Sequence, residues 1–564
     1  MKFENWDICG FDRDAAVKLC RDGFNPLVSV LLSSRGMGCT DTAQKIVNKN
    51  EAEIHDPFLM AGMKEAAARI RLALENGERI AIYGDYDVDG MTSSALLASW
   101  LQSKGADCEV YIPNRIDEGY GLNLAALDAL KSRGVDLIIT VDCGVTALKE
   151  AEYAKELGLS LVITDHHECI AKLPIADAII DPKRPDCTYP NKELAGVGVV
   201  FKLICALEND IDPMELLKKY GGLVAIGTIA DVVSVIGENR EFIKCGLDAL
   251  NSDPGIGLRE LFRTIESGIG KISSTTIGFF IAPRLNAAGR MGNSELSVKL
   301  LLSEVESEAA MYAAELSELN AERRRLETII FNEISSMLPE HGFKGPIILS
   351  HRGWHQGVTG IVAAKIAERY CLPTIIICID DSGMGRGSCR SFGNFNIFEA
   401  LLACEDILAN FGGHEMAAGI TIAEENIDEL RRRINDYFLS GEEFSAKPSL
   451  RLDFEVEKPE LLTKQNIEAL ESLEPFGNGN LPPGLCIKNA ELLSAHSIGL
   501  GKHTKLTLKK LGQNLDCICF SMPKESLGVS EGMTCDVAFE PQINVFKGKS
   551  TVQLQVIDIK PSTP

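Results

Sequence analysis

The segment that most constrains the fold of this chain is Gly84-Asp85-Tyr86-Asp87-Val88-Asp89-Gly90, which carries carboxylates on three alternate residues. The apolar run at residues 79–83 that precedes it has the length and β-rich composition of a buried strand. An apolar-periodic run without Gly or Pro follows at residues 91–101 and predicts a helix. Open parallel sheets bind ligands where the carboxyl ends of strands pass into helices. We therefore expect this acidic turn to bind a cation.

Two other interpretations of this turn are open. Its pattern matches the first half of a calcium-binding EF-hand loop, but the twelfth loop position is Leu96, where a bidentate Glu is required. The preceding segment also has the character of a strand and not of a helix. A solvated acidic loop is the more common outcome for a single Asp-x-Asp, but clusters of acids and histidines at further strand ends count against it.

Three more predicted strands end in potential ligands at the same edge. Asp142 alone could cap a helix, and His166 and His167 alone could be ordinary loop residues. Four such ends in one run of βα units are hard to explain as capping. The runs and the residues that follow them are 108–112 with Pro113-Asn114-Arg115, 136–141 with Asp142-Cys143-Gly144, and 159–164 with Asp165-His166-His167.

A fifth contributor is Asp231, which stands inside the apolar segment 221–235. The crowding of apolar residues predicts a buried helix, and a buried carboxylate is costly unless it is paired or bound to metal. A salt bridge to an arginine is the alternative. Five carboxylates with one or two imidazoles suit a pair of divalent cations, Mn²⁺ or Mg²⁺. Two such ions favour hydrolysis of a phosphorus ester or anhydride.

These residues carry a resemblance to a known family. The segment 84–90, Asp142-Cys143-Gly144, Asp165-His166-His167 and the segment 225–231 resemble the four ordered motifs of the DHH phosphoesterase superfamily and, within it, the RecJ family of bacterial exonucleases. The resemblance implies that His167 faces the scissile phosphate and that Asp85 is a nearby catalytic acid. It also implies these metal ligands: Asp87, Asp89, Asp142, His166 and Asp231.

The next region combines a basic loop with a long helix. Residues 283–291 place Arg284, Asn286 and Arg290 among small residues in a predicted loop, which suits close approach to phosphates. Residues 294–338 show a long helical pattern that contains Arg323-Arg324-Arg325. A solvated connecting helix is its simplest interpretation, and the resemblance implies that it joins two catalytic domains across a cleft.

A second α/β domain is predicted from about residue 344 to 440, with glycine-rich turns at 385–391 and 411–419. Such turns mostly serve chain reversal, although they can also cradle phosphates. The resemblance implies a DHH-associated domain whose Cys389 and Lys365 depart mildly from the family pattern. It also implies contacts with nucleic-acid phosphate, including the 5′ terminal phosphate at Arg115, from these residues: Arg115, His355, Ser388, Arg390, Gly413 and His414.

After a linker rich in Pro, Gly and Asn at 475–484, short predicted strands recur to the end of the chain. They indicate a small barrel of the OB type, which suits single-stranded nucleic acid. A purely structural β-domain with ordinary surface lysines is the alternative. No G-x-x-x-x-G-K-[ST] loop is present, which makes ATP-driven helicase activity improbable. The candidate contacts are Lys502, His503, Lys505, Lys509, Lys510, Phe520 and Phe546.

Composition limits these hypotheses. The net charge of −23 is unusual for a nucleic-acid-binding protein, but residues 446–564 hold 13 Lys and Arg against 14 Asp and Glu, so the acidity lies earlier. The 17 cysteines are scattered without a C-x-x-C pair and indicate a reducing cytoplasm. No membrane span or signal peptide is recognisable.

The expected domain boundaries divide the chain into residues 1–52 (an N-terminal appendage), 53–293, 294–340, 341–445 and 446–564.

The fold class expected is α/β: a parallel-sheet DHH domain, a long helix, a second α/β domain and a C-terminal β-barrel. The resemblance implies a 5′→3′ exonuclease that is specific for single-stranded DNA and acts in repair and recombination. It also implies partnership with single-strand-binding protein and a RecQ-type helicase. The alternatives are a phosphodiesterase of short oligonucleotides or cyclic dinucleotides, a pyrophosphatase, and a catalytically degenerate scaffold that binds single strands.

Overall fold

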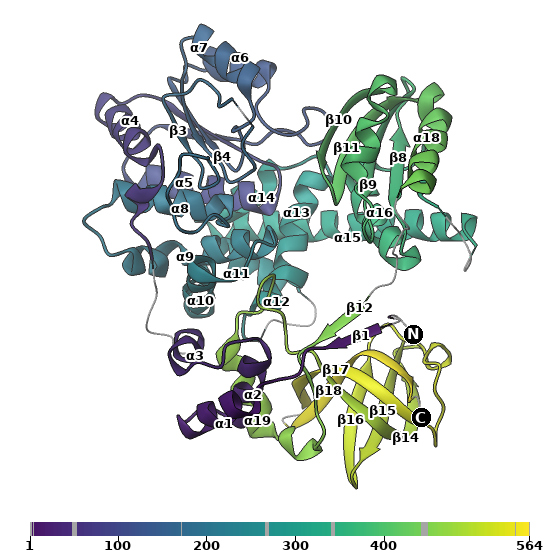
Figure 1. Ribbon diagram of the computed structural model, residues 1–564. Helices are drawn as coiled ribbons and strands as arrows, with labels where there is room; N and C mark the ends of the chain where they lie inside the picture. Colours follow the sequence, from purple (N-terminus) through teal and green to yellow (C-terminus); the bar gives the residue numbers. More distant parts are fainter. Residues whose placement is uncertain are drawn as a thin grey trace. The chain divides into compact units, whose positions relative to one another are not determined.

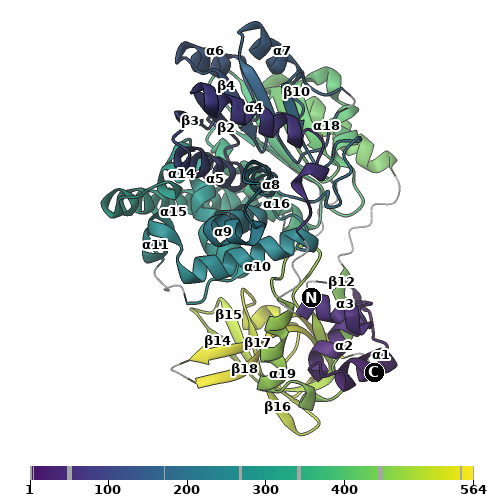
Figure 2. The same ribbon diagram turned by 90° about the vertical axis from the view of Figure 1, so that its left-hand side faces the viewer.

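The computed structural model describes residues 3, 5–47, 54–170, 172–265, 270–339, 345–441, 449–546 and 549–562. The chain divides into two compact units (Figures 1 and 2). The larger unit comprises residues 53–445 and 477–479. The smaller unit comprises residues 1–52, 446–476 and 480–564, so the two ends of the chain fold together.

The larger unit begins with a five-stranded parallel sheet. Its strand order is β3-β2-β4-β5-β6, and every neighbouring pair is parallel. The four predicted strands are confirmed, and β6 was not anticipated because it has only three residues. The strands are β2 (Ile80–Gly84), β3 (Cys108–Tyr111), β4 (Leu137–Val141), β5 (Ser160–Thr164) and β6 (Ala178–Ile180).

Helices cover both faces of this sheet, as a parallel sheet requires. In β2, Ile80 and Ile82 face one helical layer, whereas Ala81 and Tyr83 face the other. The first layer comprises α4 (Met63–Asn76), α5 (Val88–Ser103), α8 (Gly196–Leu207) and α9 (Pro213–Ala230), and the second comprises α6 (Leu124–Ser132) and α7 (Leu148–Glu156).

A helical subdomain follows, and two predictions for it are wrong. Residues 283–291 form a helix and not a loop, because Leu285, Ala287 and Ala288 are buried in the core. The single helix predicted at 294–338 is broken at residues 302–305, where Val305 is extended. The helices are α10 (Gly237–Ser252), α11 (Gly255–Arg263), α12 (Ser274–Thr276), α13 (Ala282–Arg290), α14 (Glu295–Leu301) and α15 (Glu306–Met337), with the π-helical turn η2 (Ile277–Ile281) before α13.

The second lobe of the larger unit is a five-stranded mixed sheet in the order β10-β11-β9-β8-β7. The prediction that the glycine-rich segments at 385–391 and 411–419 are turns is wrong, because most of their residues lie in strands. A Cβ on Gly385 would lie 2.7 Å from Ile377, so these glycines allow close packing within a sheet. The elements are β7 (Ile347–His351), α16 (Gln356–Tyr370), β8 (Thr374–Ile379), β9 (Met384–Arg390), α17 (Ile397–Leu402), β10 (Leu408–His414), β11 (Ala417–Ala423) and α18 (Ile427–Ser440).

The smaller unit is built on a closed five-stranded barrel, as predicted. Its ring runs β14-β15-β16-β18-β17 and is closed by pairing of β17 with β14. Its first strand is longer than the short strands that the sequence predicts, and its register shifts between Ile487 and Ala490. The strands are β13 (Phe454–Glu455), β14 (Leu485–Ile498), β15 (His503–Lys510), β16 (Gln513–Cys519), β17 (Thr534–Phe546) and β18 (Lys549–Pro561), with helix α19 (Lys464–Glu468) before them.

The N-terminal segment belongs to the core of this smaller unit. Strand β1 (Asn5–Ile8) pairs in parallel with β12 (Ser449–Leu452), and Leu19 and Leu27 pack in the same cluster as the barrel interior. Arg35 adds an ion pair with Asp453 at 2.9 Å. The helices of this segment are α1 (Arg13–Arg21), α2 (Pro26–Ser34) and α3 (Thr40–Val47).

All 17 cysteines lie within the described residues and are free. The search of the described helices for a stretch with the length and apolar character of a membrane span found none.

Candidate metal centre and nucleic-acid contacts

The acidic turn after β2 forms the start of helix α5. Asp87 is the N-cap, and its Oδ1 accepts hydrogen bonds from the N–H groups of Asp89 at 2.9 Å and Gly90 at 3.1 Å. Asp85 is buried against the same turn. A Cβ on Gly90 would lie 2.5 Å from the carbonyl oxygen of Asp85, so the turn can close this tightly only around a glycine.

Asp89 points from the first turn of α5 to the start of α8. Its carboxylate accepts hydrogen bonds from the backbone N–H of Gly196 at 2.6 Å and of Val197 at 2.8 Å. A helix N-terminus stabilises such a negative charge. Burial and the charge of Asp87 nevertheless raise the pKa of Asp89 to about 7. Among the described residues no lysine or arginine forms an ion pair with Asp89, so backbone N–H groups hold this carboxylate in position.

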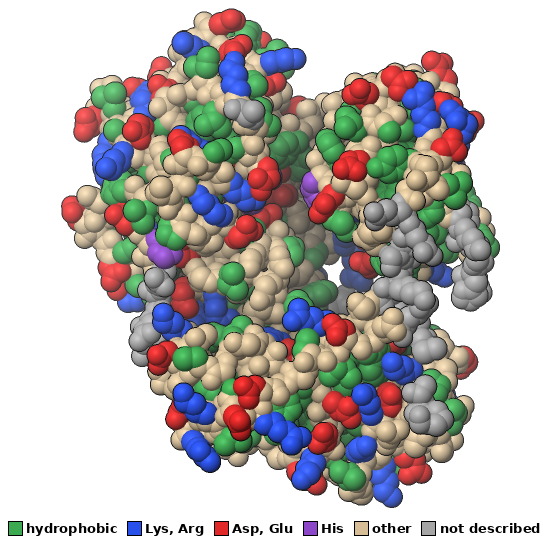
Figure 3. Space-filling model, viewed as in Figure 1, with side chains coloured by type: hydrophobic (Ala, Val, Ile, Leu, Met, Phe, Trp, Pro, Cys, Tyr) green, Lys and Arg blue, Asp and Glu red, His purple; other side chains and the backbone are tan. Residues whose placement is uncertain are grey.

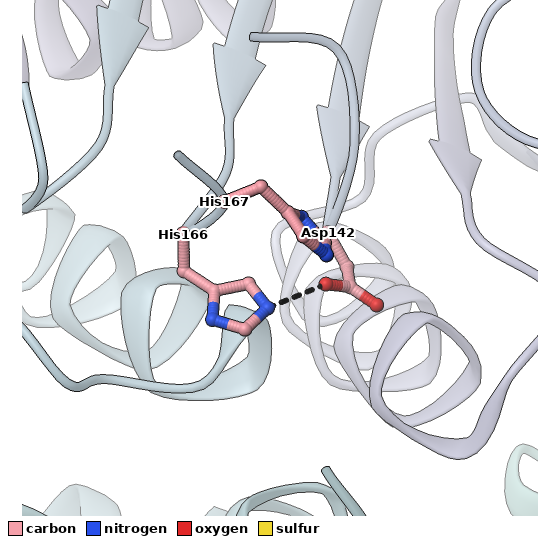
Figure 4. Close-up of side chains that lie close together, drawn as sticks. All are labelled: Asp142, His166 and His167. Carbon is pink, nitrogen blue, oxygen red and sulfur yellow. Dashed lines mark ion pairs between the residues drawn. The ribbon is translucent and has the colours of Figure 1, made fainter. Parts of the chain in front are cut away.

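Asp142 follows β4 with a left-handed backbone, φ 61°, which Asp tolerates better than most residues. Figure 4 shows its carboxylate directed at His166, and Oδ1 lies 3.1 Å from Nε2 of that imidazole. Burial raises the pKa of Asp142 well above its ordinary value, and the charges of Asp89 and Asp87 add to the effect. The geometry brings an acid and an imidazole from adjacent strand ends together.

His166 lies near two more carboxylates. Its Nε2 is 3.8 Å from Oδ2 of Asp89 and 3.8 Å from Oδ2 of Asp231. Burial, and then the charge of His167, lowers the pKa of His166 to about 3, so its imidazole is neutral and can act as a ligand. His166, which follows β5, therefore lies close to carboxylates from the segments that follow β2, β4 and α9.

The structure corrects the local setting of Asp231. Helix α9 ends at Ala230, and Asp231 follows it as the C-cap, with Val232 in a left-handed conformation. Sequence reasoning placed Asp231 inside the helix because Val232, Val233 and Val235 continue the apolar pattern. Within the described residues Asp231 forms no ion pair with an arginine, and Nε2 of the neutral His166 imidazole lies 3.8 Å from its Oδ2. Burial, with the charge of Asp89, raises the pKa of Asp231 to about 8.

The predicted site residues thus converge at one edge of the sheet. Three groups have ligand atoms within 4.8 Å of one another: Asp142, His166 and His167; Asp89, His166 and Asp231; Asp85, Asp87 and Asp142. Three buried atoms among them, Asp85 Oδ1, Asp142 Oδ1 and His166 Nε2, have no hydrogen-bond partner in the described part of the chain. Oxygen donors with one or two imidazoles are ligands that Mn²⁺ accepts, and the unpartnered atoms are those that a cation would satisfy.

His167 has two supporting residues that sequence reasoning did not assign to the site. Its Nδ1 lies 2.7 Å from Oδ1 of Asp165 and 3.2 Å from the hydroxyl of Tyr120. Asp165 is fixed in turn by the N–H of Val145 at 2.9 Å. Burial alone would lower the pKa of His167, but its bond to Asp165 and nearby carboxylates raise it to about 9. In the sequence, the two glycines that flank Tyr120 could have indicated a turn that places this side chain at the site.

The predicted phosphate contacts form a second group around arginines of both lobes. The guanidinium of Arg115 lies 4.7 Å from the centre of the Tyr86 ring. Burial lowers the pKa of Arg390, and the charge of Arg115 lowers it further. Arg290 is affected in the same way, with a pKa of about 10 that reflects burial first and then Arg115. A Cβ on Gly360 would lie 3.3 Å from Ser388 Oγ and 3.4 Å from Arg390.

The other predicted contacts occupy different settings. His355 is the N-cap of α16 and accepts the N–H of Gly357 at 3.1 Å. In the second sheet, Gly413 of β10 is paired with Ala418 of β11, and Ala418 is paired with Cys389 of β9. Gly413 is therefore one strand away from Ser388 and Arg390, the neighbours of Cys389. Arg284 and Asn286 lie on α13, and His414 is exposed at the end of β10.

In the smaller unit, the rings of His503 and Phe520 lie 5.6 Å apart on the barrel surface. Lys510 donates to the carbonyl of Lys488 at 2.7 Å. The side chain of Phe546 lies outside the described residues. Figure 3 shows acidic and basic side chains interspersed over the molecule on the face in view, which agrees with local binding and not with a generally basic face.

Comparisons with known proteins agree with this arrangement. Family models match in three places: the DHH family, N-terminal domain, at residues 79–228; the DHHA1 domain at 344–440; and the RecJ OB domain at 452–558. A single-stranded-DNA-specific exonuclease RecJ of Bacillus subtilis (strain 168) is 42% identical over 560 residues, covering 98% of this chain and 70% of that protein. The RecJ of Escherichia coli (strain K12) is 31% identical, covering 95% of this chain and 96% of its own.

The fold comparison leads to the same family. The crystal structure of RecJ in complex with Mn²⁺ from Thermus thermophilus superposes with a TM-score of 0.84 at 28% identity, covering 99% of this chain and 80% of that one. The domain matches, the sequence identity and the superposition all extend over the described units. The chain therefore belongs to the RecJ family of single-stranded-DNA-specific exonucleases.

Proposed function

We propose that this chain is a metal-dependent exodeoxyribonuclease that hydrolyses single-stranded DNA from the 5′ end and releases mononucleotides in DNA repair and recombination. The observation that carries the proposal is the convergence of Asp89, Asp142 and Asp231 within 3.1–3.8 Å of Nε2 of His166. Relatives along nearly the whole chain are single-stranded-DNA-specific exonucleases.

The donor set fits two divalent cations, Mn²⁺ or Mg²⁺. The buried atoms without hydrogen-bond partners, Asp142 Oδ1 and His166 Nε2 among them, are suitable ligands. RecJ of Thermus thermophilus has been solved with each of these two ions. Asp87 would hold one ion, and Asp89, His166 and Asp231 would hold the other; Asp142 has its ligand atoms near members of both sets. When bound, two such ions activate a water and hold the attacking and leaving oxygens of the phosphodiester.

The protein's own groups then position the substrate. His167 is protonated at neutral pH, because its bond to Asp165 holds its pKa at about 9, and it can donate a hydrogen bond to a phosphate oxygen. Tyr120 and Asp165 fix the direction of its ring. Asp85 completes the acidic wall beside Asp87 and Asp142.

The 5′→3′ polarity is proposed from the resemblance to the RecJ family, and the arginines are the groups proposed to recognise the end of the strand. Arg115 of the first lobe and Ser388 with Arg390 of the second are assigned to the terminal 5′ phosphate. Guanidinium groups bind phosphate in a bidentate manner, and a terminal phosphate offers more charge than an internal one. Figure 3 shows a furrow between the two lobes of the larger unit, and we assign the incoming single strand to it. The barrel of the smaller unit is assigned to binding single-stranded DNA. Single-strand-binding protein and a RecQ-type helicase are the proposed partners.

One assay tests this function. Single-stranded DNA labelled at the 5′ or 3′ end, the matching duplex, a short RNA, a cyclic dinucleotide and pyrophosphate are each incubated with the protein and Mn²⁺. We expect immediate release of labelled mononucleotide from the 5′-labelled strand, late release from the 3′-labelled strand and slow attack on duplex. Hydrolysis of pyrophosphate or of the cyclic dinucleotide alone would contradict the proposal.

A second test addresses the barrel. Deletion of the barrel is unsuitable because the N-terminal segment shares its core. Phe520→Ala removes an exposed ring and is expected to raise KM for a long strand several-fold without changing dinucleotide hydrolysis. Leu511→Ala, on the exposed turn between β15 and β16, is the matched control. Equal losses on both substrates would contradict a strand-binding role for the barrel.

A further inference from the structure

Two adjacent phenylalanines are exposed on a π-helical turn of the larger unit. The turn, η2, buries its first and last residues, Ile277 and Ile281, whereas the side chains of Phe279 and Phe280 are 76% and 40% exposed. Short π-helical turns inside helices occur frequently at functional sites. Rings of this size that the core does not bury are available to a ligand.

The turn is packed beside the helix that ends at Asp231. It lies against α9, where a Cβ on Gly278 would be 4.0 Å from Ile229, two residues before that acid. On the other side, Arg284 of α13 folds back and donates to the carbonyl oxygen of Phe280 at 2.7 Å. The turn that carries the aromatic pair is thus packed against the helix that ends at Asp231 and is hydrogen-bonded to Arg284 of α13.

A cavity of about 240 Å³ opens beside the same turn. Gly278, Asn286, Arg290 and Arg323 contribute to its lining, and the described residues that line it include no Asp or Glu. Arg323 donates to Glu327 at 3.1 Å, but its Nε is buried without a partner, as is the Nε of Arg284. Arg323 is thus paired with a carboxylate outside the lining, whereas Arg290 forms no ion pair with a described residue and is the cation of the cavity that is left for an anion.

Electrostatics supports an anionic occupant. Burial lowers the pKa of Arg284 and Arg290, and in each case a neighbouring arginine adds to the effect: Arg324 for Arg284 and Arg115 for Arg290. Guanidinium groups that repel one another are stabilised when an anion binds between them. A phosphate chain supplies such charges at regular intervals.

We propose that Phe279 and Phe280 form a stacking subsite for bases of the incoming single strand, whose phosphates follow Arg284 and the arginine-lined cavity. The inference rests on the proposed function and adds to it a place where bases are bound. Aromatic rings beside basic donors are the combination that binds single strands without sequence preference, because every base has a π face and every nucleotide a phosphate. A protein segment would require an apolar face without this row of cations.

The test combines ring removal with base removal. Phe279→Ala, Phe279→Trp and Phe280→Ala are compared with wild type on a 20-nucleotide strand and on a dinucleotide, with Mn²⁺. We expect KM for the long strand to rise about 10-fold in the alanine variants, kcat to stay unchanged and Trp to restore affinity. Oligonucleotides with one abasic residue at successive positions should bind wild type more weakly at one or two positions. Those positions should have no further effect in Phe279→Ala.

The outcomes separate the two proposals. If wild type does not hydrolyse the single strand, the proposed function fails whatever the variants do. If wild type is active and the abasic and alanine effects are additive at every position, the stacking subsite is overturned. A lower Tm with unchanged KM would assign the rings to folding instead. Met311→Ala removes an exposed apolar side chain on α15 and is expected to change neither quantity.

Discussion

Lys202 and Glu238 are as deeply buried as the acids of the metal centre, but their charges are neutralised by the protein. Lys202 Nζ lies 3.0 Å from Glu238 Oε1 and also donates to the carbonyl of His55. Glu238 accepts further hydrogen bonds from the N–H of His55 at 3.0 Å and the hydroxyl of Tyr189 at 2.6 Å. This group is complete without a ligand.

The acids of the metal centre show the opposite condition. Asp85 and Asp142 keep buried oxygens without hydrogen-bond partners, and burial raises their pKa well above the ordinary value. Buried charge is costly in both places unless it is compensated. The difference teaches that a fully partnered buried charge serves the fold, whereas a partly partnered cluster at a sheet edge is built for a ligand.

The largest effect expected is on stability, from Lys202→Met. Removing the ammonium leaves Glu238 charged and buried, which we expect to cost about 3–5 kcal/mol of unfolding free energy. Urea denaturation of the two proteins measures it, and the activity of the folded fraction should be unchanged. Lys218→Met, which removes an exposed partner of Glu215, is the control and should cost less than about 1 kcal/mol. Similar losses in both variants would remove the distinction.

Asp142→Asn should show the reverse pattern. Asn tolerates the left-handed backbone at this position, so the variant removes charge without straining the chain. We expect activity to fall more than about 100-fold, beyond the usual cost of losing an outer partner of a metal ligand. The Tm in EDTA should be equal or higher, because a repelling buried charge is gone.

The control for this variant is Asp128→Asn, in which the acid is exposed and bonds Tyr153. It should leave activity within about 2-fold, as surface substitutions usually do. A marked drop in the EDTA Tm of Asp142→Asn would mean that Asp142 serves the fold in the way that Glu238 does.

Metal addition sharpens the comparison at the level of binding. A ligand that binds only the folded state stabilises it by about 2.7 kcal/mol when its concentration is 100 times Kd. Mn²⁺ should therefore raise the stability of wild type and of Lys202→Met by the same increment. In Asp142→Asn most of this increment should disappear. If Mn²⁺ leaves wild-type stability unchanged, the acids do not form a metal centre.

The convergence of these acids at one sheet edge could be predicted from the sequence because its signals are local. A β-rich apolar run, an acidic turn and a helix adjoin in the chain around Asp87, and the same order recurs at Asp142, whereas His166 shares only the preceding β-rich run and the turn. Parallel strands bring their carboxyl ends to one edge, so three local patterns suffice to place residues far apart in sequence.

The misses arise where one residue type serves two physical purposes. Gly385 and Gly387 were interpreted as turn residues for their backbone freedom, but the sheet uses their missing side chains against Ile377 and Ile420. The end of α9 was hidden because Val232, and not glycine, takes the left-handed conformation. The role of the N-terminal segment depends on pairing with a strand at residue 449, which no local pattern encodes.

The smallest effect expected is from Asp165→Asn, which separates positioning from ligation within the same edge. Asp165 is buried like the proposed ligands, but both oxygens of its carboxylate are hydrogen-bonded. Oδ1 accepts a hydrogen bond from the N–H of His166 at 2.8 Å and lies 2.7 Å from Nδ1 of His167, and Oδ2 accepts one from the N–H of Val145. An amide offers only one acceptor atom, so either His167 or Val145 loses its partner. We expect kcat to fall about 10- to 100-fold with KM nearly unchanged. Stabilisation by Mn²⁺ should persist, because Asp165 is not assigned as a ligand.

Asp181→Asn is the matched control for Asp165→Asn, since this acid is also buried at the end of a strand of the sheet, after β6, and accepts a hydrogen bond from the N–H of Lys183. Burial raises the pKa of Asp181 to about 7, so the amide resembles its protonated form and should leave kcat unchanged. Loss of the Mn²⁺ increment in Asp165→Asn would place Asp165 among the ligands and redraw the boundary between the two kinds of buried acid.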